Sequence, residues 1–187
     1  MTARAGSVEA TNELQLALAS DDAFDRWYRQ TLPRVFSYVL SRCGRDQVLA
    51  EDLTQQTFVA AIDQRARFDG RSDVVTWLCG IARHKLADHF RAVERQERRR
   101  MELEVRQIRL ETDARRAPAL DERLAIGDAL RSLPAAYQAV LAFVVLDGLP
   151  VAEAAHLMRR SEGATRALLH RAREAFRQAY GGDLLDD

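Results

Sequence analysis

Apolar residues recur at three- and four-residue steps along most of the chain, which is the spacing of one face of an α-helix. The first stripe begins at Asp21 or Asp22 and ends near Gly44, and it predicts an amphipathic helix. Its apolar positions are Phe24, Trp27, Tyr28, Leu32, Val35, Phe36, Val39 and Leu40. Because proline has no backbone N–H to donate, we expect Pro33 to kink or divide this helix.

Two further helical stripes lie between residues 49 and 90, separated by a polar break at 67–73. The first stripe places Leu49, Leu53, Val59 and Ile62 broadly on one face, so that Asp52, Gln55 and Gln56 face outward. The break contains a glycine followed by Ser72 and Asp73, which are both candidate helix N-caps. The second stripe consists of Val74, Trp77, Leu78, Ile81, Leu86 and Phe90. Two helices are therefore expected to meet at a short polar loop.

The C-terminal third predicts several shorter helices. One runs through Leu124 and Leu130 to Leu133, and Pro134 starts another that ends at Asp147-Gly148. The inner stripe of that second helix is expected to be Tyr137, Val140, Leu141, Val144 and Val145. The segment after Pro150 has the size and order of a helix-turn-helix, with a turn at 159–161 and a basic second helix. Its core positions are expected to be Ala154, Met158, Thr165 and Leu168, with the small Ala155 where the helices cross.

Between these regions apolar residues become sparse and charged residues dense. We therefore predict a flexible N-terminus (1–20), a first helical domain (21–94), a charged linker (95–119), a second domain with the helix-turn-helix (120–180) and a tail (181–187). No segment shows the strict alternation of a β-strand. The expected fold class is all-α, with two small domains.

Charge and composition limit the possible functions. The chain has 187 residues with 28 basic and 28 acidic side chains, so it has no net charge to hold DNA by bulk electrostatics. DNA binding would need local basic patches, such as the arginine-rich run from Arg83 to Arg100, or a partner. The two cysteines are expected to be reduced and buried. We find no signal peptide and no apolar run of membrane-spanning length, and expect a cytoplasmic protein without membrane insertion.

No catalytic chemistry is indicated. The sequence contains no zinc-protease, phosphate-loop, serine-hydrolase or dinucleotide motif. Cys79, His84 and His89 are spaced by fives, so they point in different directions around a helix and cannot bind one metal. We expect no enzyme activity, no small-molecule substrate, no metal and no cofactor.

Three segments carry a family resemblance: AEDLTQQTF, FDGRSD and TWLCGIARHKLADHFR. They resemble the second conserved region of the extracytoplasmic-function (ECF) sigma factors, and the helix-turn-helix resembles the fourth region of the same family. The resemblance implies that Asp52, Gln55 and Gln56 dock on core RNA polymerase. It also implies that two surfaces contact promoter DNA. The minus-ten surface comprises Phe68, Asp69, Arg71, Ser72, Arg83, His84 and Lys85; the minus-thirty-five surface comprises Ser161, Arg166, Ala167, His170, Arg171 and Arg173. An anti-sigma factor is a further implied partner.

One position departs from the usual pattern. Arg159 stands where helix-turn-helix turns usually have glycine, so either the turn geometry differs or the strain is tolerated. Two alternatives to a sigma factor remain open from the residues alone. They are a free-standing helix-turn-helix regulator and a helical protein-interaction module.

Overall fold

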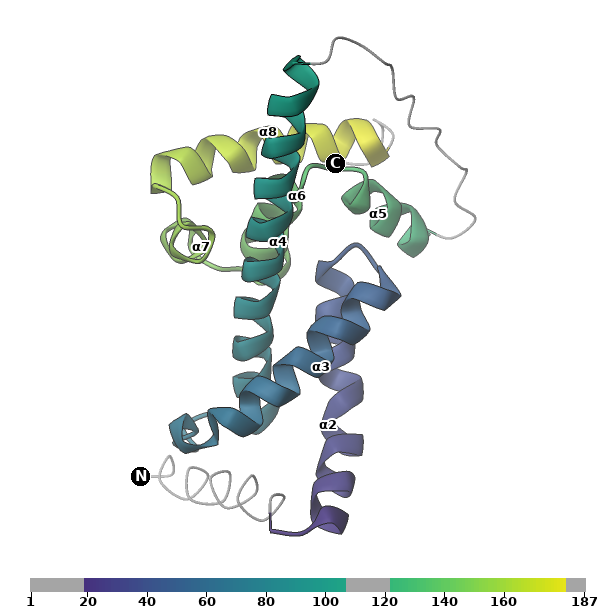
Figure 1. The fold of residues 1–187 in the computed structure, drawn as a ribbon, viewed down its shortest axis with the longest axis vertical. Coiled ribbons are helices and arrows are strands. Elements are labelled where there is room, and N and C mark those ends of the chain that lie inside the picture. Colours follow the sequence, from purple (N-terminus) through teal and green to yellow (C-terminus); the bar gives the residue numbers. More distant parts are fainter. Residues whose placement is uncertain (1–18, 107–121, 181–187) are drawn as a thin grey trace. The chain divides into compact units, whose positions relative to one another are not determined.

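The computed structural model describes residues 19–106 and 122–180, and every regular element in these ranges is a helix. The all-α fold class is therefore confirmed. Figure 1 shows the elements in chain order: α2 (Asp21–Arg42), α3 (Gln47–Asp63), the 3₁₀ turn η1 (Arg65–Arg67), α4 (Val74–Arg106), α5 (Glu122–Arg131), α6 (Ala135–Val140), the π-helix η2 (Leu141–Leu146), α7 (Val151–Met158) and α8 (Glu162–Tyr180). Most of the predicted N-terminal segment, residues 107–119 of the predicted linker and the whole tail lie outside the described residues.

The chain divides into two compact units. One contains the helices up to Lys85 without residues 42–46, and the other contains residues 42–46 and the chain from Leu86 onward. The division falls inside α4, which runs as one helix from Val74 to Arg106. It differs from the predicted domain boundaries, which stay a prediction.

In the first unit, Ser20 precedes α2, and its hydroxyl oxygen accepts a hydrogen bond from the Ala23 N–H (3.2 Å). The helix is continuous through Pro33, so this proline does not divide it, and the alternative expectation of a kink stays a prediction. Pro33 lies on the exposed face, as does Arg29 one turn earlier, so the carbonyl that loses its backbone partner can be hydrated. The predicted stripe is otherwise observed, with Trp27, Val35 and Val39 buried.

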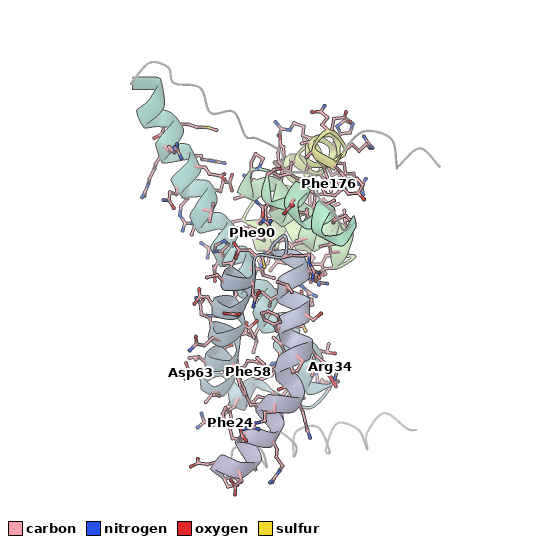
Figure 2. The ribbon with its side chains drawn as sticks, turned by 90° about the vertical axis from the view of Figure 1, so that its right-hand side faces the viewer. Phe24, Arg34, Phe58, Asp63, Phe90 and Phe176 are labelled. Carbon is pink, nitrogen blue, oxygen red and sulfur yellow. The ribbon has the colours of Figure 1, made fainter. Side chains whose placement is uncertain are left out.

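Helix α3 packs against α2 through aromatic rings. The ring of Phe58, which is labelled in Figure 2, packs edge-on against two rings of α2. It lies 5.6 Å from the ring of Trp27 and 4.7 Å from the ring of Tyr28. The sequence placed Val59 in this core, but Val59 is 55% exposed. Six residues separate it from Leu53, which turns it about 240° away from that side chain around the helix. Phe58, one position earlier, takes the buried place.

The N-terminus of α4 identifies which candidate cap is used. The Asp73 carboxylate accepts hydrogen bonds from the Val75 and Thr76 N–H groups (2.8 and 3.1 Å), so Asp73 rather than Ser72 satisfies the free donors of the first turn. From there Val74, Leu78 and Ala82 are buried on one side of the helix.

In the second unit, the helix after Pro134 changes geometry halfway. Within η2 the Asp147 N–H donates to the Ala142 carbonyl, five residues back, which is the π-helical bond. The wider turn shifts the helix phase, so Phe143 is fully buried while Val145 is 50% exposed. The sequence prediction of Val145 as an inner residue is therefore wrong.

The helix-turn-helix forms from α7 and α8 as predicted. Ala154, Met158, Thr165 and Leu168 are all buried, and Ala155 is buried at the crossing. Here the hydrophobic pattern alone was sufficient, because both helices keep regular α-helical periodicity up to the turn.

The turn at residues 42–46 belongs to the second unit and packs closely there. Gly44 has φ +62°, and a Cβ at this position would lie 3.0 Å from the Gly127 carbonyl oxygen. The Gly44 carbonyl accepts a hydrogen bond from Arg131 (2.7 Å), and Arg42 forms an ion pair with the buried carboxylate of Asp147 (2.6 Å). Only glycine allows so close an approach of the two backbones.

Candidate functional site

The outward face of α3 is the first candidate surface. Asp52, Gln55 and Gln56 are all exposed, and the Asp52 carboxylate accepts a hydrogen bond from the Gln56 amide (2.9 Å). Two valines extend this face at helical spacing: Val48 is 78% exposed and Val59 is 55% exposed. The α3 face therefore offers a carboxylate, two amides and two apolar ends. The sequence prediction did not include the valines in this surface, although a four-residue step back from Asp52 leads to Val48 and a four-residue step on from Gln55 leads to Val59.

The loop between α3 and α4 is only partly the surface that the sequence suggested. Phe68 is buried (5% exposed), with its ring 5.0 Å from that of the half-buried Trp77. Phe68 was expected among the DNA-contacting residues, but in this structure its ring is covered by its own unit. The aromatic side chain after η1 fills the space beside Trp77 because burial stabilises it more than exposure in a polar loop.

The polar residues of this loop remain available. Asp69 and Arg71 are exposed, and the Asp69 carboxylate accepts hydrogen bonds from the Arg71 N–H (3.1 Å) and pairs with its guanidinium (3.2 Å). Gly70 between them has φ +69°, which lets the backbone turn sharply. Ser72 is half-buried. The loop thus presents a pre-shaped rim of hydrogen-bonding groups.

The basic residues of α4 divide into two groups. His84 is exposed, and its neighbours Arg83 and Lys85 are half-buried. Farther along, Arg91 donates hydrogen bonds to the Leu157 carbonyl and to Asp88, both within the second unit. Glu94 accepts from Arg98 (2.7 Å) and from Arg160 of the helix-turn-helix turn. Arg91 and Arg98, in the later part of the basic run, are therefore engaged in contacts of their own unit.

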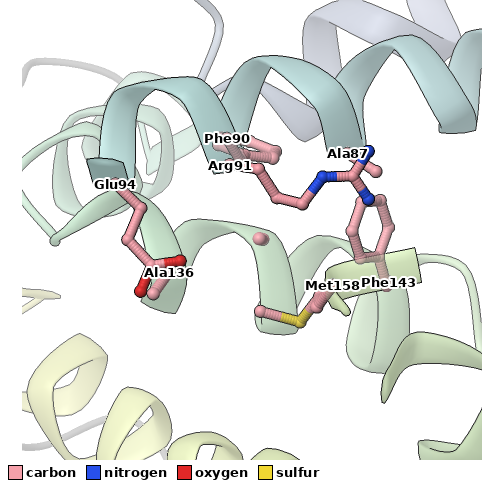
Figure 3. Close-up of a pocket in the computed structure, with 8 residues that line it drawn as sticks. Ala87, Phe90, Arg91, Glu94, Ala136, Phe143 and Met158 are labelled. Carbon is pink, nitrogen blue, oxygen red and sulfur yellow. The ribbon is translucent and has the colours of Figure 1, made fainter. Parts of the chain in front are cut away.

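Figure 3 shows the cavity that these contacts enclose. It is lined by Ala87, Phe90, Arg91, Glu94, Ala136, Ala139, Phe143 and Met158. Its volume of about 10 Å³ is at the lower limit for a single water molecule. This cavity is a packing feature and has no room for a small-molecule ligand.

The backbone conformation of Arg159 shows how the turn before α8 accommodates a residue other than glycine. Its backbone is left-handed (φ 53°, ψ 47°), and the Arg160 N–H donates to the Ala155 carbonyl (2.9 Å) in the manner of a glycine-type helix ending. The usual turn geometry is therefore kept, and the strain of a side chain at this position is tolerated. Ser161 then caps α8, accepting a hydrogen bond from the Ala164 N–H (3.2 Å).

The exposed side of α8 carries a basic groove of about 190 Å³. Its lining residues are Arg166, Leu169, His170, Arg173 and Arg177. Ala167 and Arg171 lie on the neighbouring exposed strip, where the Arg171 Nε–H donates to the Ala167 carbonyl (3.4 Å). The sequence prediction missed Arg177, which follows Arg173 by one helical turn.

Two family models match this chain, one over its N-terminal part and the other over its C-terminal part. The model of sigma-70 region 2 matches residues 27–96, and that of sigma-70 region 4 matches residues 123–176. The ECF RNA polymerase sigma factor BldN of Streptomyces coelicolor is 37% identical over 158 residues, covering 81% of this chain and 58% of BldN. The ECF RNA polymerase sigma factor SigC of Mycobacterium tuberculosis is 34% identical over 179 residues, or 94% of each chain. The chain belongs to the ECF RNA polymerase sigma factors.

A solved structure agrees with the fold of this sigma factor. The sigma factor RpoE from Bartonella quintana, solved in complex with the anti-sigma factor NepR, superposes with a TM-score of 0.52 at 21% identity, over 86% of this chain and 98% of that one. The free-standing regulator and the interaction module, left open by the residues alone, are not favoured. The α3 face, the loop and α4 to residue 96 fall in region 2 of the sigma factor, and most of α8 falls in region 4.

The remaining reactive groups of the sigma factor do not form a further site. Both cysteines are reduced, but only Cys43 is buried; Cys79 is half-buried, so its expected burial is wrong. Burial raises the pKa of the Cys43 thiol to about 11, so it stays protonated. Among the described residues no three His, Cys, Asp or Glu side chains lie together as metal ligands. No described helix has the length and apolar character needed to cross a membrane.

Proposed function

We propose that this sigma factor guides core RNA polymerase to promoters through three surfaces of its own: the α3 face, the loop with the start of α4, and the exposed side of α8. The observation that carries the proposal is the basic groove on α8, the second helix of the helix-turn-helix. The same chain also exposes the α3 face, with its polar and apolar side chains, in its first unit. It acts as a transcription initiation factor, in the cytoplasm where the polymerase works, and not as an enzyme.

Docking on core polymerase is assigned to Asp52, Gln55 and Gln56, with Val48 and Val59 at the ends of the same strip. A charge-assisted hydrogen bond from a basic polymerase residue to Asp52 would be about twice as strong as a neutral one. The valines would add roughly 1 kcal/mol or more each if they were fully covered. Polar groups would set the register, and apolar contact would supply much of the affinity.

Capture of a minus-ten base is assigned to Asp69, Arg71 and Ser72 of the loop rim. Taking a base out of the stack costs a few kcal/mol, which hydrogen bonds to the base edge can offset. Phe68 would support this rim from beneath through Trp77, in place of the direct contact expected from the sequence. The side chains of Arg83, His84 and Lys85 would hold the flanking phosphates.

Reading of the minus-thirty-five element is assigned to α8. Arg166, His170 and Arg173 share the groove, and Ala167 and Arg171 lie beside it. Arginine pairs with guanine through two hydrogen bonds, and a small apolar side chain can contact a thymine methyl group. Ser161, which caps the helix, would contribute a backbone phosphate contact at the helix N-terminus.

We further propose an anti-sigma factor as the regulating partner, because the α3 face and the basic groove of α8 are both exposed to solvent. A partner that covers both would block polymerase and promoter together. Relatives of this fold are found in such complexes, as the pairing of RpoE with NepR illustrates for that protein.

Transcription from promoters selected by the reconstituted holoenzyme tests the proposal. Wild-type protein should support promoter-specific initiation with core polymerase, and Asp52→Arg should lose core binding in a pull-down while its circular dichroism stays unchanged. Arg166→Ala should keep core binding and lose about 1–3 kcal/mol of promoter binding at one upstream base pair. Asp25→Arg, an equal charge reversal on exposed α2, serves as the control. Core binding by Asp52→Arg equal to wild type would remove the docking assignment.

A further inference from the structure

The basic strip of α8 continues beyond the residues that the family resemblance assigns to DNA. Arg166, His170, Arg173 and Arg177 follow one another by four, three and four residues, so all four project from one side of the helix. They line the same groove. Arg177 lies one residue past the end of the region 4 match at 176, so nothing in the comparison assigns it a role.

The length of this strip decides what Arg177 can reach. Eleven residues separate Arg166 from Arg177, which corresponds to about 16 Å along a helix axis. The major groove of B-DNA is only about 12 Å wide, and recognition helices insert their N-terminal residues. With Arg166 at the base edges, Arg177 would therefore lie at the border of the groove, where the phosphates are.

The positive charge of Arg177 lies close to the partial negative charge at the C-terminal end of α8. The C-terminus of a helix carries a partial negative charge, which disfavours an approaching phosphate. Arg177 lies in the last turn of α8 and places a positive charge there. Without it, the carbonyl end of α8 would face the DNA backbone with only Arg173, one turn earlier, to offset the repulsion.

Two local contacts decide how readily the Arg177 side chain can bind a phosphate. Arg177 is paired with Glu174 (2.7 Å), but both side chains are about half exposed, and exposed pairs contribute little. A phosphate can therefore replace the carboxylate at low cost. The rings of Phe176, labelled in Figure 2, and Tyr180 are stacked 5.8 Å apart and support the last turn of α8.

We propose that Arg177 is a phosphate anchor: it binds the DNA backbone at the edge of the major groove and fixes how deeply α8 enters, without reading a base. The inference rests on the proposed function of α8. It assigns to Arg177 a sequence-independent share of affinity, distinct from the base contacts proposed for Arg166.

The test measures binding of the reconstituted holoenzyme to a duplex that it selects from a randomised pool, and to the same duplex with a scrambled upstream element, across salt concentrations. Loss of one phosphate contact should reduce the slope of log K against log[salt] by about 0.9. The affinity defect of Arg177→Ala should then be about 3.5-fold larger at 50 mM than at 200 mM salt. It should be equal for the two duplexes.

Three further variants make the result specific. Arg177→Lys keeps the charge and should restore the wild-type slope, because the slope depends on the number of neutralised phosphates and lysine binds a phosphate as a point charge. Glu174→Gln removes the competing carboxylate and should not reduce affinity. Arg29→Ala, an exposed arginine on α2, should leave the slope unchanged.

An unchanged slope for Arg177→Ala, or a defect present only on the selected duplex, would overturn the anchor while leaving the function of α8 in place. A wild-type holoenzyme that binds both duplexes equally would overturn the proposed role of α8 and the anchor with it.

Discussion

Arg159 has a left-handed backbone conformation in the turn between α7 and α8. Its position in the turn is given by the two flanking helical patterns, but whether a non-glycine residue adopts the left-handed conformation depends on the contacts around it. Here the hydrogen bonds from the Arg159 and Arg160 N–H groups to the His156 and Ala155 carbonyls hold the turn. The helix ending is satisfied at the expense of local strain.

Arg159→Gly should accordingly increase the free energy of unfolding by about 0.5–1 kcal/mol. Glycine removes most of the steric cost of the left-handed conformation, although its greater freedom in the unfolded chain offsets part of the gain. Urea unfolding followed by circular dichroism measures the change. Arg159→Ala keeps the strain and removes the exposed side chain, so it should show no such gain. If Arg159→Ala were stabilised as much as Arg159→Gly, the effect would come from the lost side chain and not from the backbone.

The exposed site residues were predictable, and the buried one was not. Asp52, Gln55 and Gln56 face solvent because helical periodicity places them on the side of α3 away from its buried residues Ala50, Thr57 and Ala61. Phe68 stands in a polar, glycine-containing loop that has no period, and its burial depends on Trp77, nine residues later. Tertiary contacts of this kind leave no local signal in the sequence.

At the scale of helices, regular periodicity was predictive until the geometry changed. The sequence gives no sign that the helix after Pro134 widens into a π-turn, because the same apolar residues fit either phase. Similarly, the continuous α2 shows that proline on an exposed face need not end a helix that is held by burial on its other side.

The π-turn makes opposite predictions for two neighbouring positions. Phe143→Ala should lower the free energy of unfolding by about 3–5 kcal/mol, because a fully buried ring is removed from the core. Val145→Glu should change it by no more than about 0.5 kcal/mol, because Val145 is half exposed. Thermal unfolding of the two variants, compared with wild type, measures the difference. An uninterrupted α-helix with the predicted inner stripe would make Val145→Glu strongly destabilising, and that result would argue against the π-turn.

At the scale of the whole molecule, charge is the property that most limits independent action. The 28 basic and 28 acidic residues cancel, yet Arg166, Arg173 and Arg177 of α8 are gathered on one strip. Composition predicts this neutrality, whereas the gathering emerges only when α8 is folded. Domain boundaries are less accessible from sequence, because α4 continues to Arg106 through the start of the predicted linker.

The free sigma factor should therefore bind promoter DNA poorly, and core polymerase should raise its affinity strongly. Two small basic surfaces on a neutral chain gain little from nonspecific attraction, and engaging both at once requires them to be held at the separation of the two promoter elements. A polymerase can hold both surfaces at a fixed separation. Once one surface has bound its promoter element, the other surface then has a high effective concentration at its own element. This effect can increase affinity by 10²–10⁴ without any new contact. Gel-shift titration of selected duplex promoters with the free protein and with the reconstituted holoenzyme, at physiological salt, measures this gain.

The Arg166→Ala holoenzyme should lose affinity when the upstream element is intact and not when it is scrambled. Tight, sequence-specific binding by the free protein would contradict the dependence on polymerase and would restore the free-standing regulator as an explanation of the helix-turn-helix.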